Sequence, residues 1–382
     1  MKALVIGAGI GGLTTAIALR RHGVDVEVLE AAPEARTSGG GLGIASNATK
    51  VLRALDIDLA AAGVGRVCEH FRLCTASGRP LRELPIRSIA EELGSPVVNV
   101  RRSDLIDLLR RSLAGTPVRH GAEAVSYRRE AEGVSVLCAD GRTLAADLLV
   151  GADGIRSVVR AQSAGPEPVH EYGYVCWIAT VPFRHRRLPD GGAVHYWGSG
   201  QRFGLIDIGG GQAYWWGTKN LPPEQARRWS GGRAEILRSY QGWAEEVREV
   251  VARTPQESIT AVPAQDRSFL ESWGDGPVTL VGDAAHPMLT SLSQGAGSAI
   301  EDGYALAHHL ARAGDVATGL RRYEAARRER ARSLVAASRR LSRLEQLGNP
   351  LVVGLRNLAL RYAPASVVRR QNIAPMRCEL PS

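Results

Sequence analysis

Residues 2–30 read KALVIGAGIGGLTTAIALRRHGVDVEVLE, and this stretch decides the first part of the fold. Ala3 to Ile6 form a continuous apolar run, which is typical of a strand buried on both faces of a parallel sheet. The glycines of GAGIGG follow at once, and helix-forming residues begin at Leu13. In such a motif the first glycine permits a tight turn, the second lets the backbone approach a pyrophosphate, and the third lets the helix pack on the strand. The pattern therefore predicts a dinucleotide's pyrophosphate at the N-terminus of the helix.

The second predicted strand supports the same interpretation. It runs from Val24 to Leu29 and ends in Glu30, about 20 residues beyond the motif, where a carboxylate accepts hydrogen bonds from a ribose hydroxyl. A lone glycine motif is weak evidence, but one between a strand and a helix, with an acidic residue after the next strand, is strong. We predict binding of an adenine dinucleotide, and the alternative is a glycine-rich structural turn.

Length and composition restrict the class of protein. The chain has 382 residues, 44% of them hydrophobic and 23% charged, which fits two domains or one large domain with an insertion. No apolar run is long enough to span a membrane, and because the first strand starts at residue 2 we expect no signal peptide. Five cysteines without CxxC spacing argue for reduced thiols in a cytoplasm, and against a metal site or disulfides.

The net charge of +9 is weak evidence for a nucleic-acid partner, and we expect none. The densest basic cluster, residues 321–332 (RRYEAARRERAR), contains glutamates at helical spacing, so we interpret it as the solvated face of a helix. The positive field can still attract an anionic nicotinamide cofactor.

Segments of cofactor-binding type return late in the chain. Residues 276–281 form another apolar run, which ends in Gly282-Asp283, and residues 291–297 (SLSQGAG) lead into a long helix from about Ser298. Nearer the start, residues 39–43 (GGGLG) are interpreted as a loop for close approach of the backbone to a ligand. The nucleotide-binding part is therefore discontinuous, and another domain is inserted into it.

The inserted part has a different composition. Most of the seven tryptophans lie between residues 172 and 243, in segments such as GYVCWIATVP, AVHYW and QAYWW, which are typical of antiparallel strands. The aromatic residues have two interpretations, the core of a sheet or a wall over an apolar ligand, and both can hold.

Together these motifs resemble those of the single-component FAD-dependent aromatic hydroxylases, the 4-hydroxybenzoate-hydroxylase-like flavoprotein monooxygenases. The resemblance rests on Gly7-x-Gly9-x-x-Gly12, on Asp153-Gly154 and on Gly282-Asp283, which occur in the family's order over nearly the whole chain. Each motif alone is unspecific, whereas the three together are highly specific. Within the family the chain is similar to urate-hydroxylase-like and salicylate-hydroxylase-like members, and more distantly to the zeaxanthin-epoxidase group.

The resemblance implies an α/β fold. A Rossmann-like FAD-binding domain of the glutathione-reductase type carries an inserted, mainly antiparallel β-sheet domain for the substrate and a C-terminal helical segment. We expect the FAD-binding domain with the C-terminal helices in residues 1–70, 100–165 and 262–382, and the substrate domain in residues 71–99 and 166–261. The sequence does not decide between a monomer and a homodimer.

The resemblance also implies which residues bind FAD, held non-covalently. Asp283 is expected to accept hydrogen bonds from the ribityl hydroxyls, and residues 293–297 to direct backbone N–H groups at the pyrimidine edge of the flavin. Asp153 is ambiguous, because its motif touches both FAD and the nicotinamide in the family, and a turn-forming Asp-Gly is the alternative. The expected FAD-binding residues are Gly7, Gly9, Gly11, Gly12, Glu30, Ala31, Gly43, Arg102, Val125, Asp153, Asp283, Gly295, Ala296 and Gly297.

The implied reaction is hydroxylation or epoxidation of a small aromatic or heteroaromatic substrate through a flavin C4a-hydroperoxide, in bacterial secondary metabolism or aromatic catabolism. NADH or NADPH reduces FAD, O2 adds to the reduced ring, and an electron-rich substrate attacks the distal oxygen. NAD(P)H visits transiently in the family and needs no second glycine-rich fold. The alternatives are another flavin oxidoreductase, such as an isoprenoid reductase or a halogenase, and a non-catalytic flavin-holding scaffold.

Five residues are candidates for the substrate site. Arg202 matches the position of a substrate-binding arginine in urate-hydroxylase-like enzymes, although an arginine on a strand is usually solvent-facing. Tyr214, Trp177 and Trp216 are candidate pocket walls, with Tyr214 also a candidate for the catalytic site. Ile178 stands where the urate enzymes have a ligand-contacting asparagine. An unpaired polar group costs about 1–3 kcal/mol, so urate is disfavoured and a more apolar aromatic, indolic or polyketide-like molecule is favoured.

One segment departs from the family's pattern. Where the family commonly has Pro-x-x-Gly-Gln-Gly-Ala-Asn beneath the flavin, this chain has residues 290–297 (TSLSQGAG). Thr290 replaces the proline, Ser293 a glycine and Gly297 the asparagine. The changes lie next to the site of oxygen activation, and they keep the scaffold alternative open.

Overall fold

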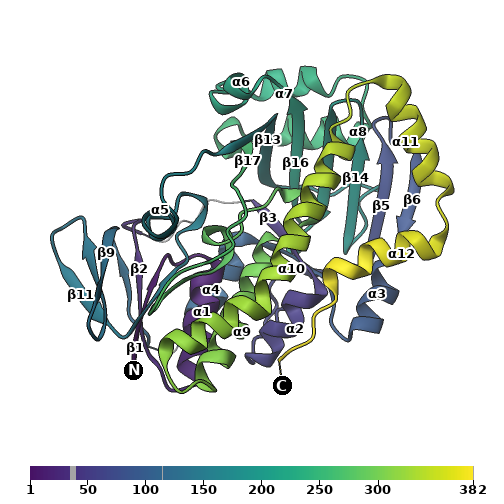
Figure 1. Cartoon of the computed structure of the whole chain (residues 1–382). Coiled ribbons are helices and arrows are strands. Elements are labelled where there is room, and N and C mark those ends of the chain that lie inside the picture. Colours follow the sequence, from purple (N-terminus) through teal and green to yellow (C-terminus); the bar gives the residue numbers. More distant parts are fainter. Residues whose placement is uncertain (35–39, 114, 382) are drawn as a thin grey trace.

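The computed structural model describes residues 1–34, 40–113 and 115–381 (Figure 1). In these ranges the strands form one five-stranded sheet, one seven-stranded sheet and two three-stranded sheets. Short 3-10 helices connect several elements: η1 (Gly154–Arg156), η2 (Gln256–Ser258), η3 (Gly282–Ala284), η4 (Thr290–Leu292) and η5 (Ala374–Met376).

The five-stranded sheet forms the centre of the nucleotide-binding part, and its strands are all parallel. In spatial order they are β18 (Val278–Leu280), β12 (Leu148–Gly151), β1 (Lys2–Ile6), β2 (Asp25–Glu30) and β8 (Val118–His120). A parallel sheet needs cover on both faces, and β1 is buried from Ala3 to Ile6 accordingly. The strand, turn and helix predicted at the start of the chain are confirmed as β1 and α1 (Ile10–Arg21).

Helices and a small sheet share one hydrophobic core with the parallel strands. The helix α1 packs against α4 (Arg102–Arg111) and α9 (Gly295–Ala311), and α10 (Val316–Glu345) packs on α9. The small antiparallel sheet has the order β11 (Thr143–Ala146), β10 (Gly133–Cys138) and β9 (Ala124–Glu130), with α5 (Val158–Ala164) beside β9. This side of the molecule matches the expected Rossmann-like part.

The glycine-rich stretch at residues 39–43 corrects one prediction. Gly41–Ile44 is not a loop but strand β3, which pairs with β7 (Val98–Arg101), and β7 pairs with β4 (Arg66–Val67). The first glycine of the stretch, Gly39, lies outside the described residues. Helix α2 (Ser46–Ala54) follows directly. At Gly41 a Cβ would lie 2.5 Å from the Cβ of Tyr214 in the large sheet, so the absent side chain lets the two parts of the molecule meet closely.

The seven-stranded sheet takes its strands from two separate parts of the chain. In spatial order they are β17 (Thr260–Asp266), β13 (His170–Pro182), β16 (Gln212–Asn220), β15 (Gln201–Asp207), β14 (Gly192–Trp197), β5 (His70–Thr75) and β6 (Pro80–Leu84). Neighbours are antiparallel except β14 and β5. The sheet matches the expected insertion, while the exact domain boundaries stay a prediction.

The remaining helices surround this large sheet. On one face lies a layer of short helices, α6 (Pro223–Arg227), α7 (Arg233–Ser239) and α8 (Glu245–Arg253). Helix α3 (Ile86–Leu93) packs beside β5, and α11 (Pro350–Tyr362) and α12 (Ala365–Ile373) lie at the outer edge near β6 (Figure 1). Within the described ranges, no helix combines the length and the apolar character needed to cross a membrane.

Candidate active site

The turn after β1 leaves open space at the N-terminus of α1. Gly7 has a φ of +104°, and a Cβ at Gly12 would overlap the Gly7 carbonyl oxygen, so both positions require glycine. At Gly9, by contrast, no atom lies within 4 Å of the place that a Cβ would take. Gly9 is also the N-cap of α1, and no side chain caps the helix there. The unbonded N–H groups and the space suit an anionic group such as a pyrophosphate.

Glu30 is fixed beside this turn. Its Oε2 accepts a hydrogen bond from Ala8 N at 2.8 Å, and its Oε1 accepts one from Ala32 N at 2.9 Å. Each carboxylate oxygen has a further lone pair, so a ribose hydroxyl can still donate to it. Of the other residues expected here, Ala31 is exposed next to Glu30, and Val125 is 44% exposed at the start of β9.

Asp153 follows β12 and lies beside the same turn. Its Oδ2 accepts a hydrogen bond from Val158 N at 2.8 Å, which fits the turn-forming alternative. Its Oδ1 is buried and has no hydrogen-bond partner in the described part of the chain. Burial raises the pKa of Asp153. One oxygen therefore supports the turn, and a ligand contact of Asp153 stays a prediction. The remaining expected residue, Gly43, lies in β3.

A second carboxylate lies at the end of β18. Asp283 is exposed between the buried Gly282 and Ala284, and none of the described residues donates a hydrogen bond to its carboxylate. Desolvation by the surrounding protein raises the pKa of Asp283, against the opposing effects of His286 and Arg102. Arg102 is itself exposed at the start of α4 and has no carboxylate partner in the described ranges. The carboxylate of Asp283 can accept hydrogen bonds from hydroxyl groups, and the guanidinium of Arg102 can bind a phosphate. The two residues therefore suit a ligand that carries both kinds of group.

The helices α1 and α9 present their N-termini to the same edge of the sheet. Helix α9 begins three residues earlier than predicted, so residues 295–297 form its first turn. A Cβ at Gly11 would lie 3.1 Å from the Cβ of Ala299, and one at Gly303 would lie 2.8 Å from the backbone nitrogen of Thr15. The second contact lies four residues, about one turn, further toward the C-terminus on each of the two helices. The helices are therefore parallel. Two helix N-termini thus favour negative charge at this site.

A buried carboxylate supports this edge from behind. Oδ2 of Asp302 accepts a hydrogen bond from Gly282 N at 2.9 Å and lies 2.6 Å from His286 Nε2, and Oδ1 accepts one from Arg327 Nε at 2.8 Å. Burial opposes the charge of Asp302, but His286 and Arg327 outweigh burial and lower the pKa to about 2. The carboxylate therefore fixes the turn that presents Asp283.

This buried network was not predicted from the sequence. Arg327 belongs to the cluster that we interpreted as a solvated helix face, but Arg327 and Glu324 are both buried. That interpretation was wrong for these two residues, because the cluster faces α9 on one side. The available signal was the adjacent pair Glu301-Asp302 in an otherwise apolar helix, since buried carboxylates require cationic partners.

The departures at residues 290–297 have structural counterparts. Ser293 has a φ of +52°, a conformation that costs a residue other than glycine about 1–2 kcal/mol. A Cβ at Gly297 would lie 3.2 Å from Asn47 Nδ2, and Asn47 donates hydrogen bonds to Gln294 Oε1 at 2.9 Å and to Glu301 Oε1 at 2.6 Å. An amide from α2 therefore fills the space next to residue 297. Its Oδ1 is buried without a hydrogen-bond partner among the described residues.

The large sheet turns an aromatic face toward β3 and the segment before α9. Tyr214 and Trp216 have ring centroids 5.5 Å apart, and His195 stands edge-on to Trp216 at 4.7 Å. Ile178 lies opposite Trp216 in the β13–β16 register, so both belong to this face. All four side chains are half-buried. The result is an apolar wall that is partly open.

Trp177 does not belong to this wall. Successive side chains on a strand point to opposite faces, so Trp177 points away from the side of Ile178. It is fully buried, with its ring 5.4 Å from Trp229 and 6.1 Å from Tyr240, in the core beneath the α6–α8 layer. The prediction that Trp177 lines the pocket is therefore wrong, and it is a core residue.

Arg202 lies on the aromatic face but is engaged with the protein. Its guanidinium forms an ion pair with Glu345 at 2.6 Å, with both side chains buried, and donates a hydrogen bond to Thr290 Oγ1 at 3.3 Å. Although burial opposes its charge, Glu345 raises the pKa of Arg202. Its Nε is buried without a partner in the described ranges. The pair joins the sheet to η4 and to the end of α10, and a substrate contact of Arg202 stays a prediction.

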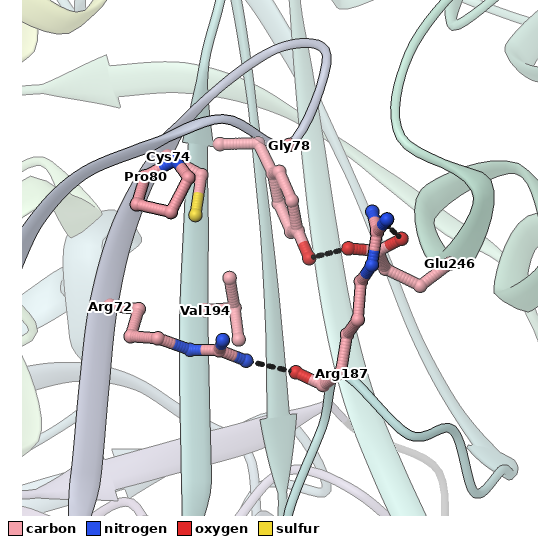
Figure 2. Close-up of a pocket in the computed structure, with 8 residues that line it drawn as sticks. Arg72, Cys74, Gly78, Pro80, Arg187, Val194 and Glu246 are labelled. Atoms are coloured by element: carbon pink, nitrogen blue, oxygen red, sulfur yellow. Dashed lines mark hydrogen bonds and ion pairs between the residues drawn. The ribbon is translucent and has the colours of Figure 1, made fainter.

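A separate hollow of about 260 Å³ lies on the other face of the large sheet (Figure 2). Glu246 in its wall accepts a hydrogen bond from the Tyr196 hydroxyl at 2.6 Å and pairs with Arg187 at 3.3 Å, so its charge is compensated by the protein. Val194 and Tyr196 of this hollow belong to the core cluster beneath the α6–α8 layer, away from Trp216. It is not part of the candidate active site.

Comparisons with known proteins agree with this geometry. The FAD binding domain family matches residues 1–338. The chain is 34% identical over 362 residues to the aurachin C monooxygenase/isomerase of Stigmatella aurantiaca, covering 94% of each chain. It is 34% identical over 353 residues to the 3-amino-4-hydroxybenzoate 2-monooxygenase of Streptomyces cremeus, covering 90% of this chain and 87% of that one. A crystal structure of Klebsiella pneumoniae HpxO with FAD and uric acid has a TM-score of 0.90 and 27% identity, covering 98% and 96% of the two chains.

The two glycines that differ in their surroundings give a matched test of the pyrophosphate site. Gly9→Ala adds a methyl group to open space, so we expect unchanged stability of the FAD-free protein and an FAD affinity lower by about tenfold or more. Gly12→Ala forces overlap with Gly7, so we expect a loss of about 1–3 kcal/mol in the free energy of unfolding. Urea unfolding and flavin titration measure both. Unchanged FAD affinity in Gly9→Ala would contradict the placement of the pyrophosphate.

His195 predicts a pH dependence of stability. Burial, together with Arg202, lowers the pKa of His195 from 6.5 to about 3. The folded state therefore binds fewer protons than the unfolded state between these values, and stability is lost as the pH falls through this interval. We expect the free energy of unfolding of the wild type to fall more steeply from pH 6.5 downward than that of His195→Gln. Parallel curves in urea unfolding at several pH values would exclude a neutral His195 in the folded state.

Proposed function

We infer the reaction from one premise, that this chain belongs to the FAD binding domain family of flavin-dependent monooxygenases. We propose that it uses NAD(P)H and O2 to place one oxygen atom on a small aromatic or heteroaromatic molecule, by hydroxylation or epoxidation. Bound FAD supplies electron transfer and oxygen activation. The observation that carries the proposal is the open space at Gly9, at the uncapped N-terminus of α1, together with the Asp283 carboxylate, which has no hydrogen-bond donor among the described residues.

The residues of the nucleotide-binding part fit FAD, and we propose that they hold it without a covalent bond. The turn at residues 7–12 accommodates the pyrophosphate, and Glu30 accepts from the adenosine ribose. Asp283 accepts from the ribityl hydroxyls, since its carboxylate has no donor among the described residues. Residues 295–297 direct their N–H groups at the flavin, and Arg102 balances the phosphate charge. Asp283 and Arg102 have no ionic or hydrogen-bonding side-chain partner among the described residues, and Glu30 keeps a further lone pair on each oxygen.

The aromatic face determines the substrate class that we propose. Uric acid, the ligand in the HpxO structure, carries amide groups around its ring. Here Ile178 and Trp216 offer no hydrogen-bond acceptor to such groups, and each unpaired group costs about 1–3 kcal/mol. A more apolar aromatic molecule, such as an indole or a polyketide-like ring system, loses nothing on this face. The Tyr214 hydroxyl, which has no partner in the described part, can orient one polar substituent.

The proposed reaction requires neither a proton donor nor a base among the side chains of this site. His195 is neutral at physiological pH because its pKa is about 3, so it is not a proton donor. The Tyr214 hydroxyl is also neutral, since burial raises its pKa. An electron-rich ring needs no base to accept an electrophilic oxygen. We therefore assign these residues to orienting the substrate and excluding water, which suits a pocket that protects a reactive cofactor.

Turnover distinguishes this proposal from its two alternatives, a flavin-holding scaffold and a flavin reductase. We expect a yellow protein whose NAD(P)H oxidation rises about tenfold or more with an indole or phenol of the correct shape, and much less with urate. With ¹⁸O2 the product should gain one labelled oxygen atom, detected by mass spectrometry. NAD(P)H oxidation that no aromatic compound stimulates would favour the scaffold, and a product that gains hydrogen would favour the reductase.

The ion pair between Arg202 and Glu345 allows a sharper test of substrate positioning. Arg202→Gln leaves a buried, unpaired carboxylate, so we expect a loss of about 3–5 kcal/mol in stability. Arg202→Gln with Glu345→Gln removes both charges and should recover most of that loss. If Arg202 also orients the substrate, the double variant keeps its FAD but its KM rises by about tenfold. A wild-type KM in the double variant would limit Arg202 to a structural role.

A further inference from the structure

Helix α11 carries an apolar stripe that faces solvent. Leu351, Leu355, Leu358 and Tyr362 are 81%, 67%, 55% and 71% exposed. Their spacing of four, three and four residues places them on a single line along the helix. Exposed apolar residues occur singly on most protein surfaces, whereas a continuous stripe of large side chains indicates an interaction surface.

The opposite side of α11 is anchored, so the stripe is not the result of a loosely attached helix. Val353 is buried, and the guanidinium of Arg356 donates hydrogen bonds to the carbonyl oxygens of Leu344 and Gly198, each at 3.1 Å. Arg356 also lies over the ring of Trp197 at 5.2 Å. The helix is therefore fixed at the edge of the large sheet with a defined orientation.

The segment that carries the stripe has charge of one sign only. Residues 346–378 contain five arginines and no aspartate or glutamate. Arg361 and Arg370 are exposed, and neither has a carboxylate partner among the described residues. Arg369 pairs with Glu92, as does Arg377, so these two are already compensated. The surface thus combines large apolar side chains with uncompensated positive charge.

We propose that this surface, the stripe of α11 with Arg361 and Arg370, binds a membrane that contains anionic lipids. An amphipathic helix with a cationic border lies in the plane of a bilayer surface, its apolar side chains between the headgroups and its arginines at the lipid phosphates. A second copy of this chain fits less well. Two such surfaces would bring arginines together, and residues 346–378 offer no carboxylate to pair with them.

The position of the surface connects membrane binding with catalysis. This step of the inference rests on the proposed function. Arg356 is bonded to the end of α10, next to Glu345, and Glu345 pairs with Arg202 on the aromatic face. The helix that carries the membrane-binding surface is therefore joined, through the end of α10, to the aromatic face. An apolar aromatic substrate partitions into a bilayer, so docking would raise its local concentration. Membrane binding itself does not depend on this step.

Sedimentation of the FAD-bound protein with vesicles tests the proposal without turnover. We expect binding to vesicles of equimolar phosphatidylcholine and phosphatidylglycerol, weakened by salt, and little binding to phosphatidylcholine alone. Leu355→Ser with Leu358→Ser should lower the partition coefficient by about tenfold or more. The matched control is Leu137→Ser with Val169→Ser, which changes exposed apolar residues elsewhere on the surface. Leu137 lies on β10 in the small sheet, at the other end of the molecule from α11 (Figure 1). The control should bind as the wild type does.

Three results would overturn the proposal. The first is no binding to either vesicle type by protein that retains its flavin. The second is equal binding by the stripe variant and the control. The third is a wild-type dimer in light scattering that the stripe variant abolishes, without vesicle binding, which would assign the surface to a second copy. All three readouts are independent of substrate turnover, so failure of the proposed reaction would leave the membrane test unaffected.

Discussion

The candidate site depends on one buried carboxylate, that of Asp302. Its hydrogen bonds to Gly282 N and Arg327, with the contact to His286, join the turn after β18, helix α9 and helix α10. A buried carboxylate without such partners would cost several kcal/mol, so these three elements keep their arrangement together. Asp283 has no hydrogen-bond donor of its own among the described residues, and its place follows from this network.

The parallel packing of α1 and α9 adds a second constraint. Small residues at the contact let the helices approach closely. Both helices begin at the carboxyl edge of the parallel sheet. Neither helix has a side-chain cap or an acidic residue in its first turn. A capping carboxylate would neutralise the positive end of a helix, so its absence from both leaves the potential available to a ligand. Arg102 adds a full charge to the same region.

Sequence patterns were informative at positions whose backbone geometry permits only one residue type. Gly7 and Gly12 are such positions, and Glu30 and Asp283 could be placed because parallel strands end at a common edge. The network around Asp302 could not be predicted, because a charged residue on a helix is usually at the surface and its burial depends on tertiary packing. Composition also could not assign Trp177, since the faces of the sheet are decided by register and both faces carry aromatic residues.

The departure at Gly297 shows how packing changes the meaning of a motif. Read along the chain, the segment lacks the family's asparagine, and the loss suggests a weakened flavin site. In the structure the amide of Asn47 reaches the same place from α2 and hydrogen-bonds Gln294 and Glu301 on either side of residue 297. A Cβ at residue 297 would lie 3.2 Å from Nδ2 of Asn47, so any side chain there would require Asn47 to shift by a few tenths of an ångström. Asn47 and Gly297 are therefore packed against each other, and the amide next to residue 297 comes from α2.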